Sequence, residues 1–529
     1  MKGFHDKVSS ILEKVVKKEY GIVLKPPLWE LPQRQEFGDL SSMAAMKIAS
    51  RLKGDPLEIA ARIKIPLEKA LSKDVDRIEI LRPGFINIFI STKALISSLN
   101  KILKDKDNFF RKSLVKKRVL IEFLSANPTG PLSVAHGRQA VVGDTIARIL
   151  AFFGDEVHRE YYLNDAGRQI ELFIQSLASR CGMVPFPEGG YKGDYIKQIA
   201  DNFKIKHEYN YRDLKRFGAK AVMSSIKGDL KALGIKFDNW FSQKKLISAK
   251  KVEGAVSVLK KKGLIFELDG ALWFSSTKFG DDKDRVIRKD DGELTYFASD
   301  IAYHKDKVER KFDKLINLWG PDHHGYIKRV KAALKALKYN EDILKIIIIQ
   351  LVTLKTKERM SKRAGTMILL SDLINDVGPD AARFYYLTRR NSSHLEFDID
   401  LAKEASFNNP LYYIQYVCAR IESIFRKAGK VSFKEDFSKF LTDPEELSLL
   451  RALLQFSYCL EKAYYFQEPV FIVEFLKNLA SSFHKFYEQK KVLEEDKSIA
   501  QARLNLVSAV RIVFHCGLSL LGIKPVVRM

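Results

Sequence analysis

Hydrophobic positions along this chain follow three different spacings, and each spacing predicts a different kind of structure. Residues 1–110 contain the helix-like run VSSILEKVV and the segment RIEILRPGFINIFIS, which predicts a strand, a Pro-Gly turn and a second strand. Residues 111–390 alternate strand-like and helix-like runs, as a parallel sheet covered by helices does. In residues 391–529 apolar residues recur three and four positions apart from about residue 405 onward, which predicts helices alone.

These spacings predict a multidomain α/β protein. We expect an N-terminal α+β domain (1–110), a Rossmann-type, doubly wound parallel-sheet domain (111–390) and an all-α helix bundle (391–529). A mostly helical insertion is expected at about 184–243, because this segment begins with the Pro/Gly-rich stretch VPFPEGGYKG and ends near FDNWFSQ. A chain of 529 residues is also too long for one hydrophobic core, which supports the division into domains.

The apolar stretches of the chain are short. The longest lies near KIIIIQLV, residues 345–352, and it predicts a buried strand because a bilayer span needs roughly 20 apolar residues. The N-terminus, MKGFHDKVSSILEKVVKKEYG, mixes acidic with basic residues and lacks the apolar segment of a signal peptide. We therefore expect a cytoplasmic protein without membrane contact.

The formal net charge is +25, and the excess of basic residues is spread along the chain. Residues 1–110 contribute +6 (20 basic, 14 acidic), residues 111–400 contribute +15 (52 and 37) and residues 401–529 contribute +4 (18 and 14). Such a distribution favours a polyanionic partner such as RNA. A lysine-rich solvated surface would give the same counts, so charge alone does not separate the two interpretations.

The four cysteines do not follow a metal-binding or disulfide pattern. Cys181, Cys418, Cys459 and Cys516 are far apart, and the sequence contains no CxxC pair. We expect them to be reduced and mostly buried, because free cysteine usually packs as a small apolar residue. A metal held by protein ligands is not expected.

One segment combines turn residues with a histidine at a predicted helix start. The strand-like RVLIEF runs into SANPTGPLSVAHGRQAVVGD, residues 125–144. In open α/β folds, ligands bind at the carboxyl ends of strands beside helix N-termini, whose free N–H groups suit phosphate. Gly137 would let a flat base approach the backbone, and His136 could donate hydrogen bonds to phosphate oxygens. A lone histidine at a helix start is more often structural, so this interpretation depends on the surrounding residues.

The surrounding stretch ANPTGPLSVAHGR resembles the first signature of class I aminoacyl-tRNA synthetases, in the form found in bacterial-type members of the arginyl-tRNA synthetase family. The class pattern is His-Ile-Gly-His. Within Ala126–His136 the second histidine is kept, whereas Ser133 replaces the first histidine and Ala135 replaces the glycine. Farther along, Arg359–Arg363 (RMSKR) resembles the second signature, Lys-Met-Ser-Lys-Ser, with arginine at its first and last positions.

The resemblance implies that the two signatures bind ATP. Adenylate formation needs no covalent nucleophile from the enzyme, because the carboxylate of the amino acid attacks the α-phosphate of ATP directly. Positioning and cationic stabilisation of the departing pyrophosphate supply the rate, which explains a lysine in the second signature. The implied catalytic residues are His136 and Lys362, and the implied ATP-binding residues are Thr129, Ser133, His136, Gly137, His323, Met360, Ser361 and Lys362.

The resemblance also implies a site for arginine. The guanidinium of arginine is planar and always charged, and a carboxylate binds it best in a bidentate pair. Glu122 ends the first strand of the domain, five residues before Asn127. Tyr296 and Asp300 are four residues apart and would share one face of a helix. The implied arginine-binding residues are Glu122, Asn127, Tyr296, Asp300 and His323.

The turn Asp322-His323-His324 in LWGPDHHGYIKR leaves two interpretations open. An aspartate beside two histidines could hold a metal ion. The segment also resembles a turn of the arginyl family that follows a strand, and we favour a nucleotide-contacting turn. We therefore predict no metal ligands here.

Further matches to the family follow in order along nearly the whole chain. YYLNDAGRQIELF, residues 161–173, resembles its Asn-Asp-x-Gly-x-Gln segment, and Gln243 stands where a glutamate is common, so no role is predicted for it. GPDAARFYYLTRRNSSHLEFDIDLA resembles the start of its anticodon-binding region. The first 110 residues resemble the additional N-terminal domain that contacts the elbow of tRNA.

The resemblance implies an enzyme that joins L-arginine to tRNA(Arg) through an arginyl-adenylate, with ATP accompanied by Mg2+, and that works as a monomer. The family generally needs tRNA bound before arginine is activated. Two alternatives remain open. One is another class I synthetase, although the zinc ligands of a cysteine enzyme and a large editing insert are missing. The other is an RNA-binding relative that lost catalysis, which the missing first histidine supports.

Overall fold

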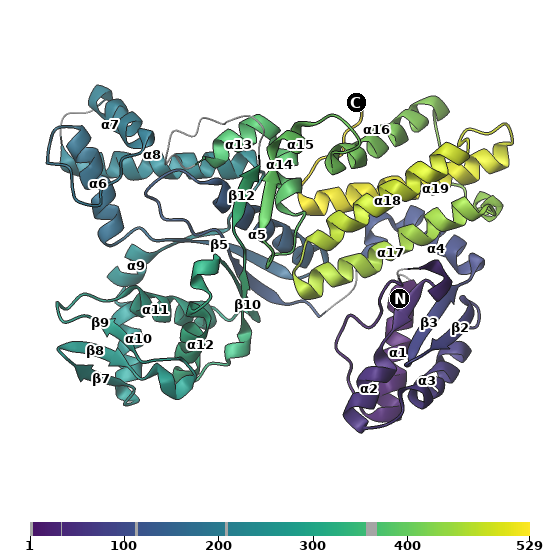
Figure 1. Cartoon of the computed structure of the whole chain (residues 1–529), viewed down its shortest axis with the longest axis horizontal. Coiled ribbons are helices and arrows are strands. Elements are labelled where there is room, and N and C mark those ends of the chain that lie inside the picture. Colours follow the sequence, from purple (N-terminus) through teal and green to yellow (C-terminus); the bar gives the residue numbers. More distant parts are fainter. Residues whose placement is uncertain (1–3, 33, 112–114, 207–209, 356–367) are drawn as a thin grey trace. The chain divides into compact units, whose positions relative to one another are not determined.

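The computed structural model describes residues 4–32, 34–111, 115–206, 210–355 and 368–529. The chain forms two compact units (Figure 1). The first consists of Met1–Leu114, Phe152–Gly154 and Glu404–Met529, and the second of Val115–Ala151 and Asp155–Lys403. The predicted first and third domains therefore belong to one unit, and the predicted sheet domain forms most of the other.

The N-terminal part of the first unit is a three-stranded antiparallel sheet packed against helices, as the apolar pattern predicts. The strand order is β1-β3-β2, with β1 (Leu40–Ser42), β2 (Val75–Leu81) and β3 (Phe85–Ile90). Fully buried residues such as Val8, Leu12 and Ile63 form the core between sheet and helices. The helices are α1 (Phe4–Tyr20), α2 (Ala44–Leu52), α3 (Pro56–Leu71) and α4 (Thr92–Asp105), with 3-10 turns η1 (Gln35–Phe37) and η2 (Lys106–Phe110).

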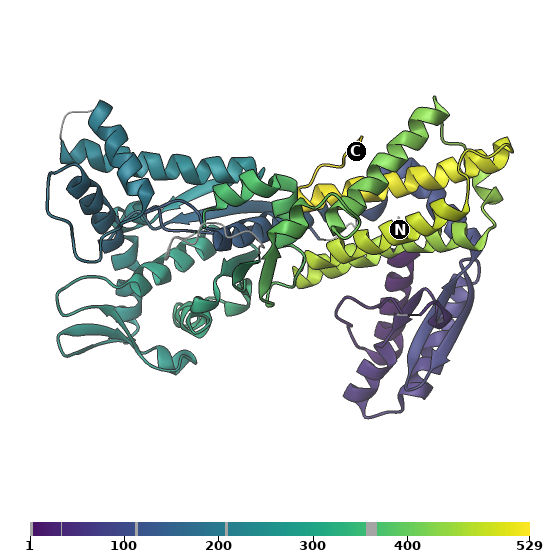
Figure 2. The ribbon, with the colours of Figure 1, turned by 45° about the horizontal axis from the view of Figure 1, so that its top comes forward.

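The C-terminal part of the first unit is a helix bundle, which confirms the prediction from the three-four spacing. Its helices lie side by side in Figures 1 and 2. Capping residues set where they begin: the Asn409 side chain accepts the N–H groups of the first turn of one helix, and Asp496 does so in another. The helices are α16 (Pro410–Ala428), α17 (Pro444–Phe466), α18 (Val470–Gln489) and α19 (Lys497–Leu521), with the 3-10 turn η6 (Glu435–Phe440).

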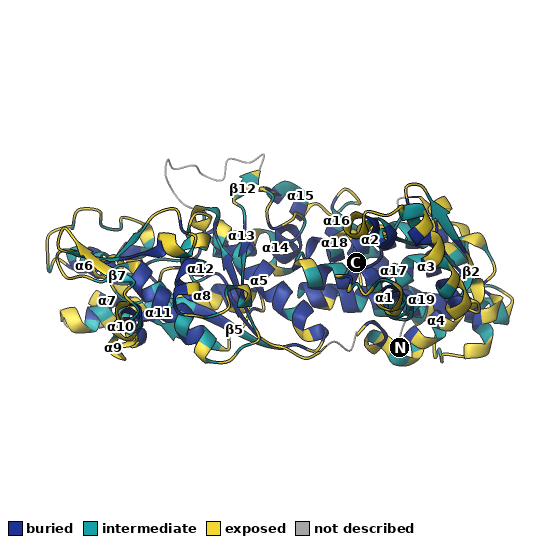
Figure 3. Cartoon of the chain, turned by 90° about the horizontal axis from the view of Figure 1, so that it is seen from below, coloured by how far each residue is buried: buried dark blue, intermediate teal, exposed yellow. Residues whose placement is uncertain are grey.

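Helix α19 is the one helix in the described ranges whose length and apolar composition would also suit a membrane span. Most of its apolar stretch is buried inside the bundle, and Val507, Val510 and Phe514 are fully buried. Figure 3 shows such buried residues along the bundle helices. A core helix of a bundle passes the same test of length and composition. The four cysteines are free and buried, as expected.

The second unit is built around a five-stranded parallel sheet, as predicted. The strand order is β11-β10-β4-β5-β6, with β4 (Arg118–Glu122), β5 (Glu156–Leu163), β6 (Asn239–Ser242), β10 (Lys314–Trp319) and β11 (Leu344–Ile348). Three consecutive residues of β4, Val119 to Ile121, are buried, because helices cover both faces of a parallel sheet. The chain adds strands on one side of β4 and then on the other. The carboxyl end of β4 is therefore the switch point at which such sheets bind ligands.

The segment between β5 and β6 is mostly helical, as predicted for residues 184–243. It contains α6 (Arg168–Arg180), α7 (Asp194–Lys206) and α8 (Tyr211–Ala232), which gather beside one another in Figures 1 and 2. The last residues of the predicted insertion include Asn239–Ser242, which form β6 and pair in parallel with β5. They therefore belong to the sheet, and the helical insertion ends earlier than the sequence suggested.

A second group of elements lies between β6 and β10. It includes an antiparallel sheet, β7 (Ile265–Leu268), β8 (Ala271–Phe274) and β9 (Arg285–Arg288), which the sequence pattern did not predict. Its strands are only four residues long, too short to show a clear alternation. The accompanying helices are α9 (Gln243–Ser248), α10 (Lys251–Lys261) and α11 (Tyr296–Glu309), with the 3-10 turn η3 (Ser276–Phe279).

The remaining elements of the second unit follow β10. The strands β12 (Val352–Lys355) and β13 (Leu395–Asp398) form a separate parallel pair. The helices are α5 (Val134–Phe152), which follows β4, and α12 (Tyr326–Ala336), α13 (Leu370–Val377), α14 (Pro379–Tyr386) and α15 (Ile399–Lys403), with the 3-10 turns η4 (Pro321–His323) and η5 (Glu341–Ile343).

Candidate active site

The chain turns sharply where β4 ends. Leu124 and Ser125 have positive φ angles of 72° and 42°, a conformation that non-glycine residues rarely adopt and that is concentrated at functional sites. The Ser125 hydroxyl donates to Oε1 of Glu122 at 3.0 Å and accepts the backbone N–H of Tyr162 at 3.1 Å. These bonds fix the turn and hold the Glu122 side chain at the carboxyl end of the strand.

His136 and Ser133 contact each other at the start of α5. The backbone N–H of Ser133 donates to Nδ1 of His136 at 3.0 Å, and the Ser133 hydroxyl lies 2.9 Å from the same nitrogen. Burial lowers the pKa of His136, which favours the neutral ring. Because Nδ1 accepts the backbone N–H, the proton of the neutral ring is on Nε2. His136 can therefore donate a hydrogen bond from Nε2, and Ser133 orients the ring that does so.

Gly137 is buried inside the protein. A Cβ at this position would lie 2.5 Å from Oη of Tyr386 and 2.6 Å from Cδ1 of Leu370. Packing against these two side chains therefore already requires a glycine. The predicted approach of a nucleotide base to Gly137 stays a prediction.

Arg138 is fully buried and holds three backbone carbonyls. Its guanidinium donates to the carbonyl oxygens of Gln350 at 2.9 Å, Ser393 at 2.8 Å and Arg390 at 2.9 Å. These residues lie just before β12 and just before β13. The first signature helix is thereby tied to the ends of two strands, β12, which precedes the second signature, and β13, which follows it.

The second signature itself, with Met360, Ser361 and Lys362, lies outside the described residues. The segment that follows it is paired with the first signature: the N–H of Val134 donates to the carbonyl of Ile368 at 3.3 Å, and the N–H of Leu370 donates to the carbonyl of Leu132 at 2.8 Å. Both flanks of the second signature therefore contact the segment around the start of α5.

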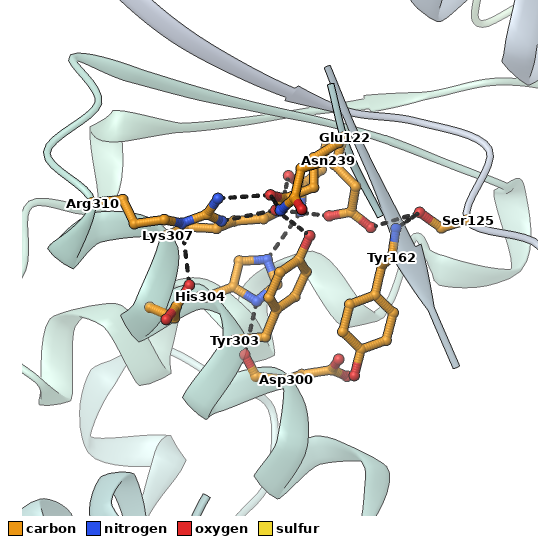
Figure 4. A network of polar contacts seen from close by, with 12 residues as sticks. Glu122, Ser125, Tyr162, Asn239, Asp300, Tyr303, His304, Lys307 and Arg310 are labelled. Carbon is orange, nitrogen blue, oxygen red and sulfur yellow. Dashed lines mark hydrogen bonds and ion pairs between the residues drawn. The ribbon is translucent and has the colours of Figure 1, made fainter. Parts of the chain in front are cut away.

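Glu122 is buried and paired with a lysine (Figure 4). The Nζ atom of Lys307, from α11, forms an ion pair with Oε2 of Glu122 and donates to Oδ1 of Asn317 at 2.8 Å. The Nδ2 group of Asn317 lies 2.9 Å from Nε2 of His304, whose Nδ1 lies 2.8 Å from the backbone carbonyl of Asp300. A continuous chain of hydrogen bonds thus links the carboxylate of Glu122 to the backbone of Asp300.

A second buried carboxylate, Glu160 of β5, is bound by Tyr303 and Arg310, which Figure 4 labels beside Lys307. Arg310 binds it through two nitrogens at 2.6 and 2.8 Å, the Tyr303 hydroxyl donates to it at 2.8 Å, and Asn239 donates to it at 2.7 Å. Burial acts to raise the pKa of Glu160, but the Arg310 hydrogen bonds and the charges of Lys307 and Arg310 hold it below its usual value. This carboxylate is saturated by protein donors and acts as a structural anchor.

Asp300 has a different environment. Its Oδ2 accepts a hydrogen bond from the Tyr326 hydroxyl at 2.6 Å, and Figure 4 shows its carboxylate pointing toward the hydroxyl of Tyr162. Burial and, to a smaller extent, the charge of Glu122 raise the pKa of Asp300 to about 7, although the Tyr326 bond and the charges of Lys307 and Arg329 oppose this shift. The carboxylate is therefore poised to exchange a proton near neutral pH.

Asn127 lies in the turn after β4 and has a fixed amide. Its Nδ2 donates to Gln169 at 2.6 Å, and its Oδ1 accepts from Asn164 at 3.2 Å. Both partners belong to the Asn-Asp-x-Gly-x-Gln segment. Tyr296, the first residue of α11, is 52% exposed. Its hydroxyl lies close to Gly167: a Cβ placed on this glycine would be 3.8 Å from the hydroxyl oxygen. The structure thus places Asn127 and Tyr296 beside the same short segment.

The turn after β10 carries His323. Its ring lies 5.8 Å from the Trp319 ring and 6.2 Å from the Tyr326 ring, centroid to centroid, so it neighbours the tyrosine that binds Asp300. Its Nε2 lies 3.4 Å from the exposed carboxylate of Asp322. Among the described residues, three His, Cys, Asp or Glu side chains do not gather anywhere in a way that could hold a metal ion.

Thr129 is buried in the loop before α5. Its N–H donates to the carbonyl of Asn127 at 2.8 Å, and its own carbonyl accepts the Tyr195 hydroxyl at 2.8 Å. Because its backbone N–H and carbonyl are already bonded within the protein, the predicted contact of Thr129 with ATP would be made by its side-chain hydroxyl.

The structure adds residues that the sequence analysis did not single out: Tyr162, Lys307, Asn317 and Tyr326. Lys307 and Asp300 are seven residues apart in α11 and therefore face the same side of that helix. This spacing could have identified Lys307 from the sequence, because a charged residue on the helix face that packs against a sheet is uncommon. The contribution of Tyr162, Asn317 and Tyr326 depends on long-range contacts that a sequence pattern does not show.

Comparisons with known proteins identify the family. Residues 98–182 and 191–393 match the family described as tRNA synthetases class I (R), catalytic domain; residues 3–90 match the arginyl tRNA synthetase N terminal domain, and residues 414–529 match the DALR anticodon binding domain. The arginine–tRNA ligase of Desulfosudis oleivorans is 44% identical over 520 residues, which cover 94% of this chain and 93% of that protein. The chain belongs to the arginyl-tRNA synthetase family.

Other members of the arginyl-tRNA synthetase family are similar over the full length. The arginine–tRNA ligase of Thermotoga maritima is 40% identical over 540 residues, covering 98% of each chain. The solved Thermus thermophilus arginyl-tRNA synthetase aligns with a TM-score of 0.82 over 99% of this chain and 100% of that chain, at 21% identity. This second likeness shows that the fold is shared.

Membership in the arginyl-tRNA synthetase family decides one of the alternatives left open by the sequence. The interpretation as another class I synthetase is wrong, since the match includes the arginyl-specific N-terminal domain as well as the catalytic domain. The first signature of this member departs from the usual pattern at Ser133 and Ala135, and Ala135 is exposed. The adjoining His136 keeps both its position at the helix start and its donor nitrogen.

Proposed function

We infer that this chain attaches L-arginine to tRNA(Arg) for protein synthesis. The observation that carries the inference is full-length similarity to arginine–tRNA ligases, at 44% identity over 94% of the chain. In the first step the carboxylate of arginine attacks the α-phosphate of ATP, which forms arginyl-adenylate and releases pyrophosphate. In the second step a hydroxyl of the terminal adenosine of tRNA attacks the arginyl carbonyl, and AMP leaves.

The arginine substrate is proposed to bind between Glu122 and Asp300. The two carboxylates belong to one linked network, and a carboxylate such as that of Asp300, which accepts the Tyr326 hydroxyl at Oδ2, is the group that pairs best with a guanidinium. Asn127, Tyr296 and His323 are proposed to complete this site. Their support is the placement of Asn127 and Tyr296 beside the Asn164–Gln169 segment and of His323 beside Tyr326.

ATP is proposed to bind at the start of α5. His136 offers a donor from Nε2 toward the phosphates, and helix N–H groups favour negative charge at the same place. Mg2+ is proposed to arrive with ATP, as a hard cation held largely by phosphate oxygens. The proposed contacts come from Thr129, Ser133, His136, Gly137 and His323, and from Met360, Ser361 and Lys362 outside the described residues, with His136 and Lys362 as the catalytic pair.

The tRNA is proposed to contact all three predicted domains, with residues 1–110 at its elbow, residues 111–390 at its acceptor end and residues 391–529 at its anticodon. In the last of these, the match to the DALR anticodon binding domain, residues 414–529, includes Tyr416 and Arg420 of α16 and Tyr487 of α18. Arg420 lies 5.1 Å from the ring centroids of both Tyr416 and Tyr487, and Phe407 is 57% exposed beside them. An exposed phenylalanine beside two half-buried tyrosines and an arginine suits unstacked bases.

Replacing Arg420 by alanine should weaken tRNA binding about tenfold, or about 1.4 kcal/mol, which is at the low end of the roughly 1–3 kcal/mol that one stacking contact with a base contributes. The measurement is the dissociation constant for tRNA(Arg) at fixed salt, together with the KM for ATP, which should stay unchanged. The exposed Lys439→Ala variant in the same unit is the control. Equal losses in the two variants would show that only overall charge matters.

The function is tested by ATP–pyrophosphate exchange with each of the twenty amino acids, with and without tRNA. We expect exchange with arginine alone, and only when tRNA is present. Exchange with lysine or with a neutral amino acid would contradict the substrate. Absence of adenylate with arginine, ATP, magnesium and tRNA all present would revive the interpretation as an RNA-binding relative.

The affinity for arginine should rise with pH between about 6 and 8. Asp300, whose pKa is raised to about 7, is mostly protonated below that value, and a cationic guanidinium binds the carboxylate. Binding must then release a proton at acidic pH, and affinity should fall by up to about tenfold per pH unit below pH 7. Isothermal titration in buffers of different ionisation enthalpy counts the protons released. A flat affinity with no proton release would contradict the proposed role of Asp300.

We further propose that the chain acts as a monomer in the cytoplasm, without membrane contact. A monomer of 60.6 kDa is expected in sedimentation at the concentrations used for the exchange assay. A dimer that persists on dilution would contradict it.

A further inference from the structure

Lys307 places a fully buried ammonium group inside the proposed arginine site. Its Nζ forms the ion pair with Glu122, lies 2.8 Å from Oδ1 of Asn317 and lies 4.3 Å from the centroid of the Tyr303 ring. Burying a charge is costly, and apolar residues of similar size often serve stability equally well. The position of Lys307 therefore calls for a role beyond stability.

The donors and acceptors along this chain of bonds have only one consistent arrangement. The carbonyl of Asp300 can only accept, so Nδ1 of His304 carries the proton and Nε2 accepts from Asn317. Burial and the charge of Lys307 lower the pKa of His304 to about 3, which keeps its ring neutral. The Asn317 carbonyl oxygen must then face Lys307, whose ammonium only donates. Each bond fixes the direction of the next one.

We propose that Lys307 is a positioning residue for arginine recognition: it holds the carboxylate of Glu122 in one orientation and, through Asn317 and His304, fixes it relative to Asp300. This proposal rests on the proposed arginine site. A carboxylate fixed before the substrate arrives loses little freedom on binding, which raises affinity. It also favours a planar guanidinium, whose bidentate pairing needs carboxylates at set positions, over the point charge of a lysine ammonium.

The main test is a double-mutant cycle with Lys307→Gln, Glu122→Gln and the double variant Glu122→Gln/Lys307→Gln. Lys307→Gln keeps a donor but removes the charge, and it should raise the KM for arginine by about ten- to a hundredfold with an unchanged KM for ATP. Because Lys307 is proposed to act through Glu122, the double variant should bind arginine no more weakly than Glu122→Gln alone. Independent, additive losses would overturn the proposal.

The double variant also covers the case in which Lys307→Gln fails to fold. It leaves no unpaired buried charge, so it should remain folded, as judged by its thermal melting curve. A further loss of arginine affinity beyond that of Glu122→Gln would then overturn the proposal without the single variant. Tyr303→Phe is the matched control: it removes the hydroxyl bond to Glu160 and keeps the ring beside Lys307, and it should leave the KM for arginine near the wild-type value.

Two further readouts separate positioning from a purely structural role. Discrimination of arginine from lysine in adenylate formation should fall in Lys307→Gln. The pH midpoint of arginine affinity should move upward, because Lys307 opposes the raised pKa of Asp300. The other groups that face Asp300 are Glu122 from β4, Tyr162 from β5, and Tyr326 and Arg329 from α12, and they are unchanged in the variant.

Unchanged discrimination and an unchanged midpoint would leave Lys307 as a structural residue and overturn the proposal. The proposed function fails in a different way. It fails if the wild-type protein activates an amino acid other than arginine, whatever the Lys307 variants do. An active arginine enzyme in which Lys307→Gln leaves the KM for arginine unchanged contradicts only the role of Lys307.

Discussion

Asp300→Asn should lower kcat/KM for arginine. The loss should correspond to about 2–5 kcal/mol of activation free energy, the cost of removing one partner of a buried charge pair. Asparagine keeps the size of the side chain and an oxygen that can accept the Tyr326 hydroxyl, so the loss should report the missing charge. The KM for ATP should change little. The pH dependence of arginine affinity should also disappear, because the titrating group is gone.

Glu309→Gln is the matched control for this variant. Glu309 lies on the same helix, α11, with a half-exposed carboxylate paired with Lys305, away from Glu122 and Asp300. The Glu309→Gln variant removes one negative charge from the helix, as Asp300→Asn does, and should leave kcat/KM for arginine unchanged. A loss of similar size in both variants would mean that the charge of the helix matters and that Asp300 makes no specific contact.

His136→Ala should slow adenylate formation by raising its activation free energy by about 2–4 kcal/mol, the usual loss when one hydrogen-bond donor to the charge of the transition state is removed. Ser133→Ala should cost only about 1 kcal/mol, the net value of one neutral hydrogen bond. The backbone N–H of Ser133 still holds Nδ1 of His136 in that variant. Single-turnover formation of arginyl-adenylate, measured with tRNA bound, compares the two.

The double variant shows how Ser133 acts. If its hydroxyl orients His136, as the 2.9 Å contact indicates, then Ser133→Ala should add almost nothing once His136 is alanine. If its hydroxyl contacts the phosphates of ATP, as the sequence analysis proposed, the two losses should add. A loss from Ser133→Ala as large as that from His136→Ala would contradict the proposed division of roles.

Local patterns were sufficient to predict the main elements of the fold. The run before the first signature forms β4, the Pro-Gly hairpin joins β2 to β3, and the three-four spacing after residue 405 forms the bundle. The antiparallel sheet β7–β9 was not predicted, because strands of four residues carry too few positions for a period-two pattern. The insertion boundary was placed too late because a short edge strand, β6, was not distinguished from its helical surroundings.

The candidate site was predictable where a residue follows from a motif. Glu122 and Asp300 were singled out, and the structure brings them into one network. The motif says nothing about what surrounds them. Lys307, on α11, pairs with Glu122, 185 positions away. It also binds Asn317, which lies opposite Glu122 only because β4 and β10 are paired in parallel. The spacing from Asp300 is a local signal for Lys307 itself, but its pairing with Glu122 comes from the assembled helix and sheet and has no local signal.

The hold of Arg138 on the carbonyls of Gln350, Arg390 and Ser393 joins the first signature to segments before and after the second one through non-covalent bonds. The covalent path between them, more than two hundred residues long, contributes little to their alignment. Doubling the length of a flexible loop along that path costs only about 0.6 kcal/mol of closure entropy. A change in the length of the helices between β5 and β6 should therefore leave this alignment intact, because Arg138 and the backbone bonds of Val134 and Leu370 hold it.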